Sequence, residues 1–257
     1  MENREKTQES NEELNIIVGR NPVMEAVRSG REIDRLLVAH GAAGGSVAAI
    51  IAKCSARGIL IKEVSSQKLD FLCGHANHQG VAVMFAQHEY CEVSDILDLA
   101  KQREQAPFII ICDEIEDPHN LGAIIRTAEA CGVHGIIIPK RRSASLNATV
   151  AKSASGALEY MKVARVTNIS TEIENLKKQG VWVFGADMDG TDYTLTDYSG
   201  PCAIVIGNEG KGIGRLVREK CDGVISLPMN GKITSLNASV AAGIFMYEIV
   251  RQRNAVV

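Results

Sequence analysis

The chain has 257 residues and a formal net charge of −3, and 46% of its residues are hydrophobic and 23% charged. These values are typical of a soluble globular protein. The apolar runs are all far shorter than the roughly 20 residues that a membrane span requires. Five glutamates against one lysine and one arginine give the first 14 residues their negative charge, so the remaining chain is electrically balanced. The sequence therefore excludes a membrane-embedded protein and a polycation that coats nucleic acid.

The N-terminal third begins with a polar segment and continues as an α/β pattern. Residues 1–14 contain only Met1 and Leu14 as apolar side chains, so we expect a disordered acidic tail. A small α/β unit is predicted over 15–88, because apolar runs and an alanine-rich segment alternate there. Its expected strands are 33–39, 59–64 and 80–86, and its expected helices are 47–57 and 66–73. Residues 89–106 are polar and charged and contain one predicted helix, 94–104, and we interpret them as a linker.

The remaining block, 107–257, alternates strand and helix in a way that is typical of a parallel α/β sheet. Its strand signals are continuous apolar runs, which favours strands covered by helices on both faces. The expected strands are 108–112, 135–138, 161–166, 181–186, 202–206 and 223–227. The expected helices are 120–130, 147–156, 170–179, 214–221 and 236–253.

Cysteine and histidine usage argues against disulfide and metal frameworks. The seven cysteines are an odd number without a C-x-x-C pair, and several lie in apolar segments. This pattern favours free thiols in a reducing cytoplasm, and the polar N-terminus lacks the apolar core of a secretory signal. The six histidines show no zinc-site spacing. An acidic run from Asp113 to Asp117 is compatible with a magnesium site, but a solvated turn in which Asp117 caps the next helix is favoured.

Four loops rich in glycine and polar residues follow predicted strands, and they begin at Asp113, Asp187, Gly207 and Pro228. Ligands of open parallel sheets bind beyond the carboxyl ends of the strands, so these loops predict one cleft. The loop 207–214 does not fit a phosphate site, because it lacks the Ser or Thr of a P-loop and its Glu209 would repel a pyrophosphate. It suits a cofactor that tolerates a carboxylate, such as a sulfonium. A plain turn is the other interpretation.

A second functional hypothesis comes from residues 187–191, Asp-Met-Asp-Gly-Thr. They match the D-x-D-G-T nucleophile motif of haloacid-dehalogenase-type phosphatases. That motif normally opens its fold and requires a second acidic pair far downstream. The chain after Thr191 contains no paired aspartates, which disfavours this reaction class.

Three segments resemble, in order, the motifs of the SpoU (TrmH-type) branch of the SPOUT methyltransferases. Residues 120–128, NLGAIIRTA, resemble N-x-G-x-x-x-R-T-A, and residues 206–212, IGNEGKG, resemble a hydrophobic-G-N/S-E-x-x-G motif. Residues 227–241 contain the Leu-Pro-Met and Ser-Leu-Asn-Ala-Ser-Val-Ala of the third motif. The first block also resembles the RNA-binding domain of the family, at 18–27 and 78–81. The resemblance therefore covers nearly all of residues 15–253.

The resemblance implies transfer of a methyl group from S-adenosylmethionine to a ribose 2′-hydroxyl of RNA. Similarity to the RlmB-like subgroup implies a guanosine of bacterial 23S ribosomal RNA, and a transfer RNA ribose is the alternative. The implied fold is α/β, with a trefoil-knotted parallel-sheet SPOUT domain over 107–257 and a small N-terminal α/β domain over 15–88 that binds the RNA substrate. A homodimer whose interface completes the active site is also implied. A non-enzymatic RNA-binding or assembly protein is a third hypothesis, against which the intact motifs argue.

Arg126 is the catalytic residue that the resemblance implies. A guanidinium holds its proton too tightly to be an easy general base. We therefore expect Arg126 to bind the adjacent RNA phosphate and to stabilise the developing alkoxide. Without the resemblance, an ion pair with Glu129 would be the expected role of this side chain.

The other implied site residues divide between the substrate and the cofactor. Asn120 would orient Arg126 or the ribose, Glu209 would hold the loop or the ribose, and Ser235 and Asn237 would hold the substrate nucleotide. Residues expected to bind the cofactor are Gly185, Gly207, Leu227 and Leu236, with Gly185 lining the pocket. The basic cluster Lys140, Arg141 and Arg142 is a candidate RNA contact, and a solvated loop is the other interpretation. No metal is expected.

Overall fold

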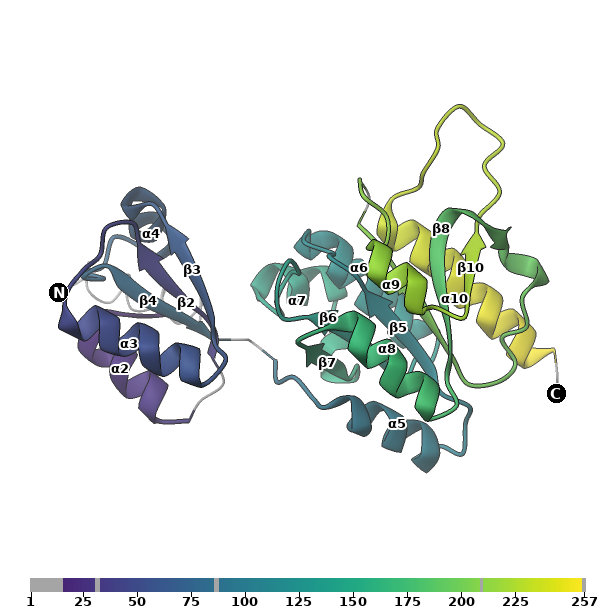
Figure 1. Cartoon of the computed structure of the whole chain (residues 1–257), viewed down its shortest axis with the longest axis horizontal. Coiled ribbons are helices and arrows are strands. Elements are labelled where there is room, and N and C mark those ends of the chain that lie inside the picture. The colour runs from purple at the N-terminus through teal and green to yellow at the C-terminus, as the bar shows by residue number, and fades with distance from the viewer. Residues whose placement is uncertain (1–15, 31–32, 86–87, 209, 256–257) are drawn as a thin grey trace. The chain divides into compact units, whose positions relative to one another are not determined.

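The computed structural model describes residues 16–30, 33–85, 88–208 and 210–255 (Figure 1). The chain divides into two compact units between Glu89 and Tyr90. The acidic tail expected over 1–14 lies outside the described residues. In the part that the structure describes, no helix is long and apolar enough to cross a membrane.

The first unit is a mixed four-stranded sheet with helices on both faces. In spatial order its strands are β1 (Ile16–Val18), β4 (Val81–Phe85), β2 (Ile33–Ala39) and β3 (Leu60–Val64), and only the β2–β3 pair is parallel. Helices α2 (Arg20–Arg28) and α3 (Gly45–Ala56) cover one face, and α4 (Ser66–Leu72) packs on the other through Leu69.

The two segments of this unit that carry the resemblance lie side by side. Arg20 Nε donates to the Gln79 carbonyl oxygen at 3.1 Å, and Arg20 Nη1 donates to Ser46 Oγ at 3.2 Å. One arginine thus ties the start of α2 to the loop before β4 and to the first turn of α3. The elements β1 and α2 were not among those expected, because β1 has only three residues and α2 has only three fully buried positions.

The second unit is a six-stranded sheet in which every neighbouring pair is parallel. In spatial order its strands are β10 (Gly223–Ser226), β8 (Trp182–Asp192), β9 (Cys202–Ile206), β5 (Phe108–Cys112), β6 (Gly135–Pro139) and β7 (Val163–Val166). The helices of one face are α6 (Pro118–Ala130), α7 (Ala148–Ala154) and α10 (Ala238–Asn254). Those of the other face are α5 (Val93–Gln102), α8 (Ile169–Lys178) and α9 (Arg215–Lys220). Two short 3-10 turns, η1 (Ala157–Glu159) and η2 (Tyr193–Leu195), complete the unit.

The strands of this sheet are apolar at consecutive positions because helices cover both of its faces. All five residues of β5 are buried. Alternate side chains enter two separate cores: Phe108 and Ile110 pack with α6 and α10, whereas Ile109 and Ile111 pack with α5 and α8. A strand with helices on both faces has no solvent-facing side, so its sequence does not alternate. The predicted doubly covered parallel sheet is confirmed. The trefoil knot stays a prediction.

The segment 89–106, which composition predicted to be a linker, belongs to the second unit from Tyr90 onward. Ile96 and Ala100 of α5 are fully buried, and a Cβ on Gly135 of β6 would lie only 2.5 Å from Ile96 Cδ1. The Tyr90 hydroxyl accepts a hydrogen bond from the Leu146 N–H at 3.0 Å. The polar composition reflects the exposed face of an amphipathic helix, which average composition does not distinguish from a linker.

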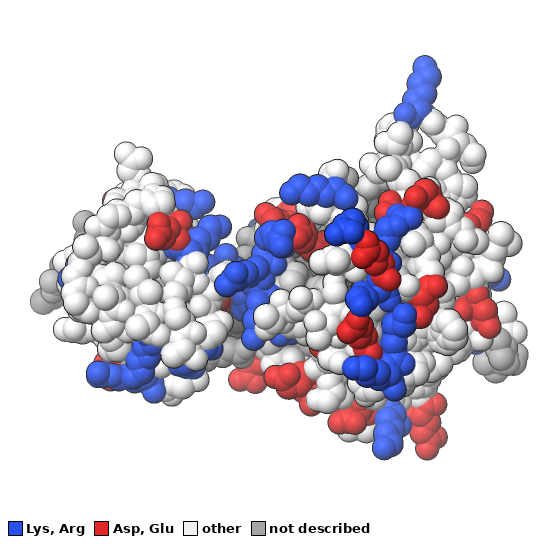
Figure 2. Space-filling view, viewed as in Figure 1, with Lys and Arg blue, Asp and Glu red and all other residues white. Residues whose placement is uncertain are grey.

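Charges on this unit are distributed unevenly (Figure 2). Over α8 and α9 acidic and basic side chains are interleaved, and many form ion pairs, such as Arg215 with Glu219 at 2.9 Å. Basic side chains also gather near α7 and β6, where Lys140, Arg141 and Arg142 are exposed after the end of β6. The paired charges of α8 and α9 largely compensate one another, so the basic region near β6 is better suited to a polyanion.

Candidate active site

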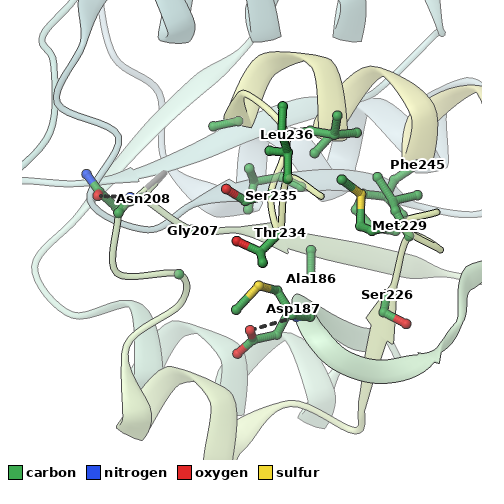
Figure 3. A pocket seen from close by; sticks show the side chains of 18 of the residues that line it. Ala186, Asp187, Gly207, Asn208, Ser226, Met229, Thr234, Ser235, Leu236 and Phe245 are labelled. Carbon is green, nitrogen blue, oxygen red and sulfur yellow. Dashed lines mark hydrogen bonds between the residues drawn. The ribbon is translucent and has the colours of Figure 1, made fainter. Parts of the chain in front are cut away.

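A cavity of about 680 Å³ opens where β9 and β10 end and where β8 leaves its neighbours (Figure 3). Four residues that the sequence singled out line it: Gly207, Leu227, Ser235 and Leu236. Apolar side chains, among them Met229 and Phe245, form part of its wall, and the hydroxyls of Thr234 and Ser235 add polar groups. A cavity with apolar walls and a few polar groups is typical of a small-molecule site.

The loop after β9 folds back on itself through its own backbone. The Asn208 N–H donates to the Gly212 carbonyl at 3.1 Å, and the Gly212 N–H donates to the Asn208 carbonyl at 2.8 Å. Gly212 has φ +65°, which favours glycine. A Cβ on Gly207 would overlap the Gly212 backbone. Gly207 is therefore required for the loop to close.

The segment after β5 anchors this loop. Asp113 is buried, and its Oδ2 accepts a hydrogen bond from the Gly214 N–H at 2.7 Å. Burial raises the pKa of Asp113, and the bond from Gly214 opposes that rise. Asn208 Nδ2 donates to the Glu114 carbonyl at 3.2 Å. Two residues of the acidic run thus position the cavity loop.

The rest of that acidic run has ordinary structural partners. Glu114 pairs with Arg142 at 2.8 Å. Asp117 caps α6 by accepting a hydrogen bond from the His119 N–H at 2.9 Å, so the predicted cap is confirmed. Among the described residues, no group of three or more His, Cys, Asp or Glu side chains is arranged to hold a metal ion.

The first and third motifs meet at two asparagines. Asn237 Nδ2 donates to Asn120 Oδ1 at 2.9 Å, although 117 residues separate them. The Asn237 Oδ1 caps α10 by accepting hydrogen bonds from the Ser239 N–H at 3.0 Å and the Val240 N–H at 3.3 Å. Asn120 is only 8% exposed on α6. The pair fixes the start of α10, directly after the cavity residues Ser235 and Leu236, against α6.

Arg126 lies exposed on α6 and does not line the cavity. Its Nη1 donates to Ser155 Oγ at 3.2 Å, at the end of α7. Within the described part of the chain Arg126 forms no ion pair, so the alternative pairing with Glu129 is absent. Gly122 brings the two helices together, because a Cβ there would lie 2.8 Å from the Val150 carbonyl oxygen and closer still to Ser153 Cβ. The place of Arg126 therefore depends on the α6–α7 contact.

Of the four residues expected to bind the cofactor, Gly185 alone does not line the cavity. Gly185 faces α9, since a Cβ on it would meet Ile213 Cδ1 at 2.6 Å and Cys221 Sγ at 3.2 Å. Its neighbour Ala186 lines the cavity instead. Successive residues of a strand face opposite sides, so an error of one residue moves the prediction to the wrong face. Glu209 lies outside the described residues.

Asp187 begins one of the four loops that the sequence placed at the cleft, and it also lies in the segment that matches the phosphatase motif. It lines the cavity and forms an ion pair with Arg218, which also pairs with Asp189 at 2.8 Å. An arginine that binds both aspartates of the D-x-D-G-T segment occupies their carboxylates, which disfavours a phosphatase nucleophile. The signal for a cavity wall was present in the sequence, because Asp187 follows an apolar strand.

Comparison with known proteins supplies the decisive observation. Residues 107–247 match the SpoU rRNA Methylase family, and residues 16–91 match RNA 2′-O ribose methyltransferase substrate binding. The chain belongs to the SpoU methylase family. It is an RNA methyltransferase, as the three motifs implied, and the phosphatase hypothesis is wrong.

The sequences of its relatives align with this SpoU methylase over most of its length. A Bacillus subtilis protein assigned to the TrmH family of tRNA/rRNA methyltransferases, YacO, is 48% identical over 93% of the chain and 96% of its own length. A TrmH-family protein of Staphylococcus aureus is 46% identical over 94% of the chain and 97% of its own length. The AdoMet-bound rRNA methyltransferase structure from Sinorhizobium meliloti is 27% identical, with a TM-score of 0.57 over 94% of the chain and 89% of its own.

Proposed function

We propose that this enzyme transfers a methyl group from S-adenosylmethionine to the ribose 2′-hydroxyl of a guanosine in 23S ribosomal RNA. The observation that carries the proposal is the cavity built from Gly207, Leu227, Ser235 and Leu236, to which the Asn120–Asn237 bond joins the first motif. The S. meliloti rRNA methyltransferase with bound AdoMet supports this cofactor. The substrate-binding match over 16–91 supports an RNA substrate, and the RlmB-like sequence pattern favours ribosomal RNA.

The residues of the cavity fit the proposed cofactor. Leu227, Leu236 and Phe245 offer apolar surface to an adenine, while the hydroxyl of Thr234 can bond to polar groups of the cofactor. The closed turn 207–212 holds the loop backbone in place beside the cavity. When bound, S-adenosylmethionine supplies a methyl group on a sulfonium, which is a good leaving group. The remaining tasks of the protein are positioning the ribose and favouring loss of its proton.

Arg126 favours loss of the proton from the ribose hydroxyl, and it does so by contacting the RNA and not the cofactor. Its guanidinium is exposed, has no carboxylate partner among the described residues and is held only by Ser155 Oγ. It is therefore available to bind a phosphate with two parallel hydrogen bonds and to stabilise an alkoxide. Asn120 and Asn237 keep α6 in register with the cavity, Ser235 holds the nucleotide, and Glu209 holds the loop or the ribose.

The RNA approaches over the basic region that follows β6. Arg142 pairs with Glu114, whose carbonyl accepts a hydrogen bond from Asn208 of the cavity loop. The cluster of Lys140, Arg141 and Arg142 is thus connected to the cavity through one residue. Binding there weakens with salt, because phosphate contacts release counterions.

A second copy of the chain completes the active site. Val240, Ile244 and Tyr247 form a partly exposed apolar stripe on α10 at helical spacing, and with Tyr193 and Arg251 they line a shallow hollow. A stripe of this kind is a suitable homodimer surface. We place the enzyme in the cytoplasm, because all seven cysteines are free thiols and a reducing compartment keeps thiols in that state.

Tritium transfer from labelled S-adenosylmethionine to purified RNA tests the reaction. We expect label in 23S ribosomal RNA at a ribose 2′-oxygen of a guanosine. Label in transfer RNA alone would show that transfer RNA is the substrate instead of ribosomal RNA. The absence of label in every RNA tested would refute the proposed methyltransferase activity.

Arg126→Ala tests the division between substrate and cofactor. Removing one transition-state donor commonly costs about 10²–10³ in rate, so methyl transfer should be nearly abolished. Cofactor affinity measured by calorimetry should stay unchanged, because Arg126 does not line the cavity. A tenfold loss of cofactor affinity would contradict the assignment of Arg126 to the RNA side.

A further inference from the structure

One wall of the cavity is a segment of β8 that leaves the sheet. Gly185 of β8 pairs with Val224 of β10, and the next pair is Thr191 with Ile225. Residues 186–190 therefore form a bulge in β8 between two consecutive residues of β10. We call residues 186–190 the β8 excursion. Pairing with β9 also ends at Gly185. Ala186, Asp187 and Met188 of the excursion line the cavity. This part of the wall therefore lacks the ladder hydrogen bonds that hold the rest of the strand.

The far end of the excursion is fixed by the sheet. Ser226 Oγ donates to the Gly190 carbonyl at 2.8 Å. A Cβ on Gly190 would lie 2.5 Å from the Ile225 carbonyl carbon, so the chain returns to β10 in close contact. These contacts hold the last residue of the excursion, whereas the residues that line the cavity precede it.

The cavity-lining part is held from α9 by Arg218. Its Nη1 contacts Asp187 Oδ2, and its Nη2 lies 2.8 Å from Asp189 Oδ1. The other oxygen of Asp187, Oδ1, accepts a hydrogen bond from the Met188 N–H at 2.8 Å. The guanidinium thus binds the carboxylates on both sides of Met188. Only arginine presents several donors in a rigid fork that can do this; lysine offers a point charge.

The two ion pairs differ in exposure. The side chain of Asp189 is 72% exposed, and pairs of that kind contribute little to stability. The side chain of Asp187 is 22% exposed, and that of Arg218 is 32% exposed. Among the described residues that line the cavity, Asp187 has the only anionic side chain. Hydrogen bonds to Arg218 hold the pKa of Asp189 below its ordinary value, so this contact stays charged at neutral pH.

We propose that Arg218 is a positioning residue for cofactor binding, which it supports by holding Asp187 and the cavity wall from Ala186 to Met188 in one shape. The inference rests on the proposed function, since it assigns the cavity to S-adenosylmethionine. Arg218 itself does not line the cavity and touches no reacting group. Its effect is to order the wall before the cofactor arrives, so that binding does not have to order it.

Calorimetry and steady-state kinetics on the full-length protein test the proposal with S-adenosylmethionine as the probe. We expect Arg218→Gln to raise the cofactor Kd and KM about tenfold, as loss of preorganisation predicts. The kcat at saturating cofactor and the KM for RNA should stay within about twofold. Arg218→Lys should recover part of the affinity, because an ammonium can still pair with one carboxylate.

Arg215→Gln is the matched control. Arg215 lies on the same helix, is largely exposed and pairs with Glu219 at 2.9 Å without contacting the excursion. Its substitution should leave every constant unchanged. Asp187→Asn removes the other partner at nearly the same size, and the double variant Arg218→Gln with Asp187→Asn should bind no more weakly than the weaker single variant.

The outcomes separate this inference from the proposed function. A wild-type protein that does not bind S-adenosylmethionine would refute the cofactor assignment itself. A wild-type protein that binds it, with an unchanged Kd in Arg218→Gln, would overturn the positioning role. So would a fall in kcat at saturating cofactor without a change in KM, or losses that multiply in the double variant.

Discussion

Replacing Gly122 by alanine tests whether the contact between α6 and α7 sets the position of Arg126. The new Cβ would lie 2.8 Å from the Val150 carbonyl oxygen, 3.1 Å from the Ala154 nitrogen and closer still to Ser153 Cβ. Ordinary carbon contacts are about 3.5–4.0 Å, so the helices must separate by about 1 Å. Overpacking of this kind costs about 1–3 kcal/mol, against a gain in helix propensity of about 1 kcal/mol. Backbone atoms cannot rotate away, so we expect a net loss of stability of up to about 2 kcal/mol.

The same displacement should reduce catalysis. Arg126 is held by Ser155 at the end of α7, at 3.2 Å, so separating the helices breaks or lengthens that bond. A misplacement of about 1 Å can cost about 10²-fold in rate. Urea denaturation gives the free energy of unfolding, and tritium transfer to RNA gives the rate. Cofactor affinity should change little, because neither Gly122 nor Arg126 lines the cavity.

A double variant with Ser153→Gly makes the test specific. Removing the nearest obstructing atom should restore part of both stability and rate, with a coupling energy of about 0.5 kcal/mol or more. A Gly122→Ala protein that is more stable than the wild type and fully active would refute the reasoning. It would show that the two helices separate without cost and that Arg126 does not depend on them.

Two further substitutions probe the cavity loop and a buried histidine. Gly207→Val should abolish cofactor binding in calorimetry because its Cβ overlaps the Gly212 backbone and opens the loop; normal binding by the folded variant would contradict this. His134 accepts a hydrogen bond from the Phe108 N–H at 3.0 Å, and burial lowers its pKa from 6.5 to about 4. Its contribution to stability should be complete above pH 6.5 and lost as the pH falls towards 4. Urea titrations should show a shallower decline for His134→Gln.

Much of the second unit was predictable because a strand that is buried on both faces has a continuous run of apolar residues in its sequence. Ile109 and Ile110 enter different cores, so the strand shows a continuous apolar run. The cavity residues Gly207 and Leu227 were predictable because motifs fall at strand ends, where parallel sheets bind ligands. The Asn120–Asn237 bond was not, because no local pattern records a contact over 117 residues.

The errors have specific physical causes. Gly185 was placed on the wrong face because the side-chain direction of a strand reverses at every residue. The loop that begins at Asp187 was expected at the cleft, but its ion pair with Arg218 was not, because a contact between β8 and α9 leaves no periodic signal. Segment 89–106 was misassigned because its buried residues, such as Ile96, are few among charged ones.

That last correction determines where the methyltransferase unit can be cut. A fragment that begins at Ala106 loses Ile96 and Ala100, which are fully buried, and the Tyr90 hydroxyl that accepts from Leu146. Burying one isoleucine side chain contributes about 1.5–3 kcal/mol, so this fragment should be less stable than one beginning at Tyr90 by at least about 1.5 kcal/mol.

The longer fragment, 90–257, should fold, dimerise and bind S-adenosylmethionine with the affinity of the full chain, because the whole cavity lies within it. It should methylate ribosomal RNA poorly, because it lacks residues 16–89 of the segment that matches substrate binding. Linked sites bind more tightly than either alone, and that gain disappears when one is removed. Urea denaturation, calorimetry and tritium transfer on both fragments measure these effects. Equal stability of the two fragments would refute the structural role of α5, and full methylation by 90–257 would show that the first unit does not recognise the RNA.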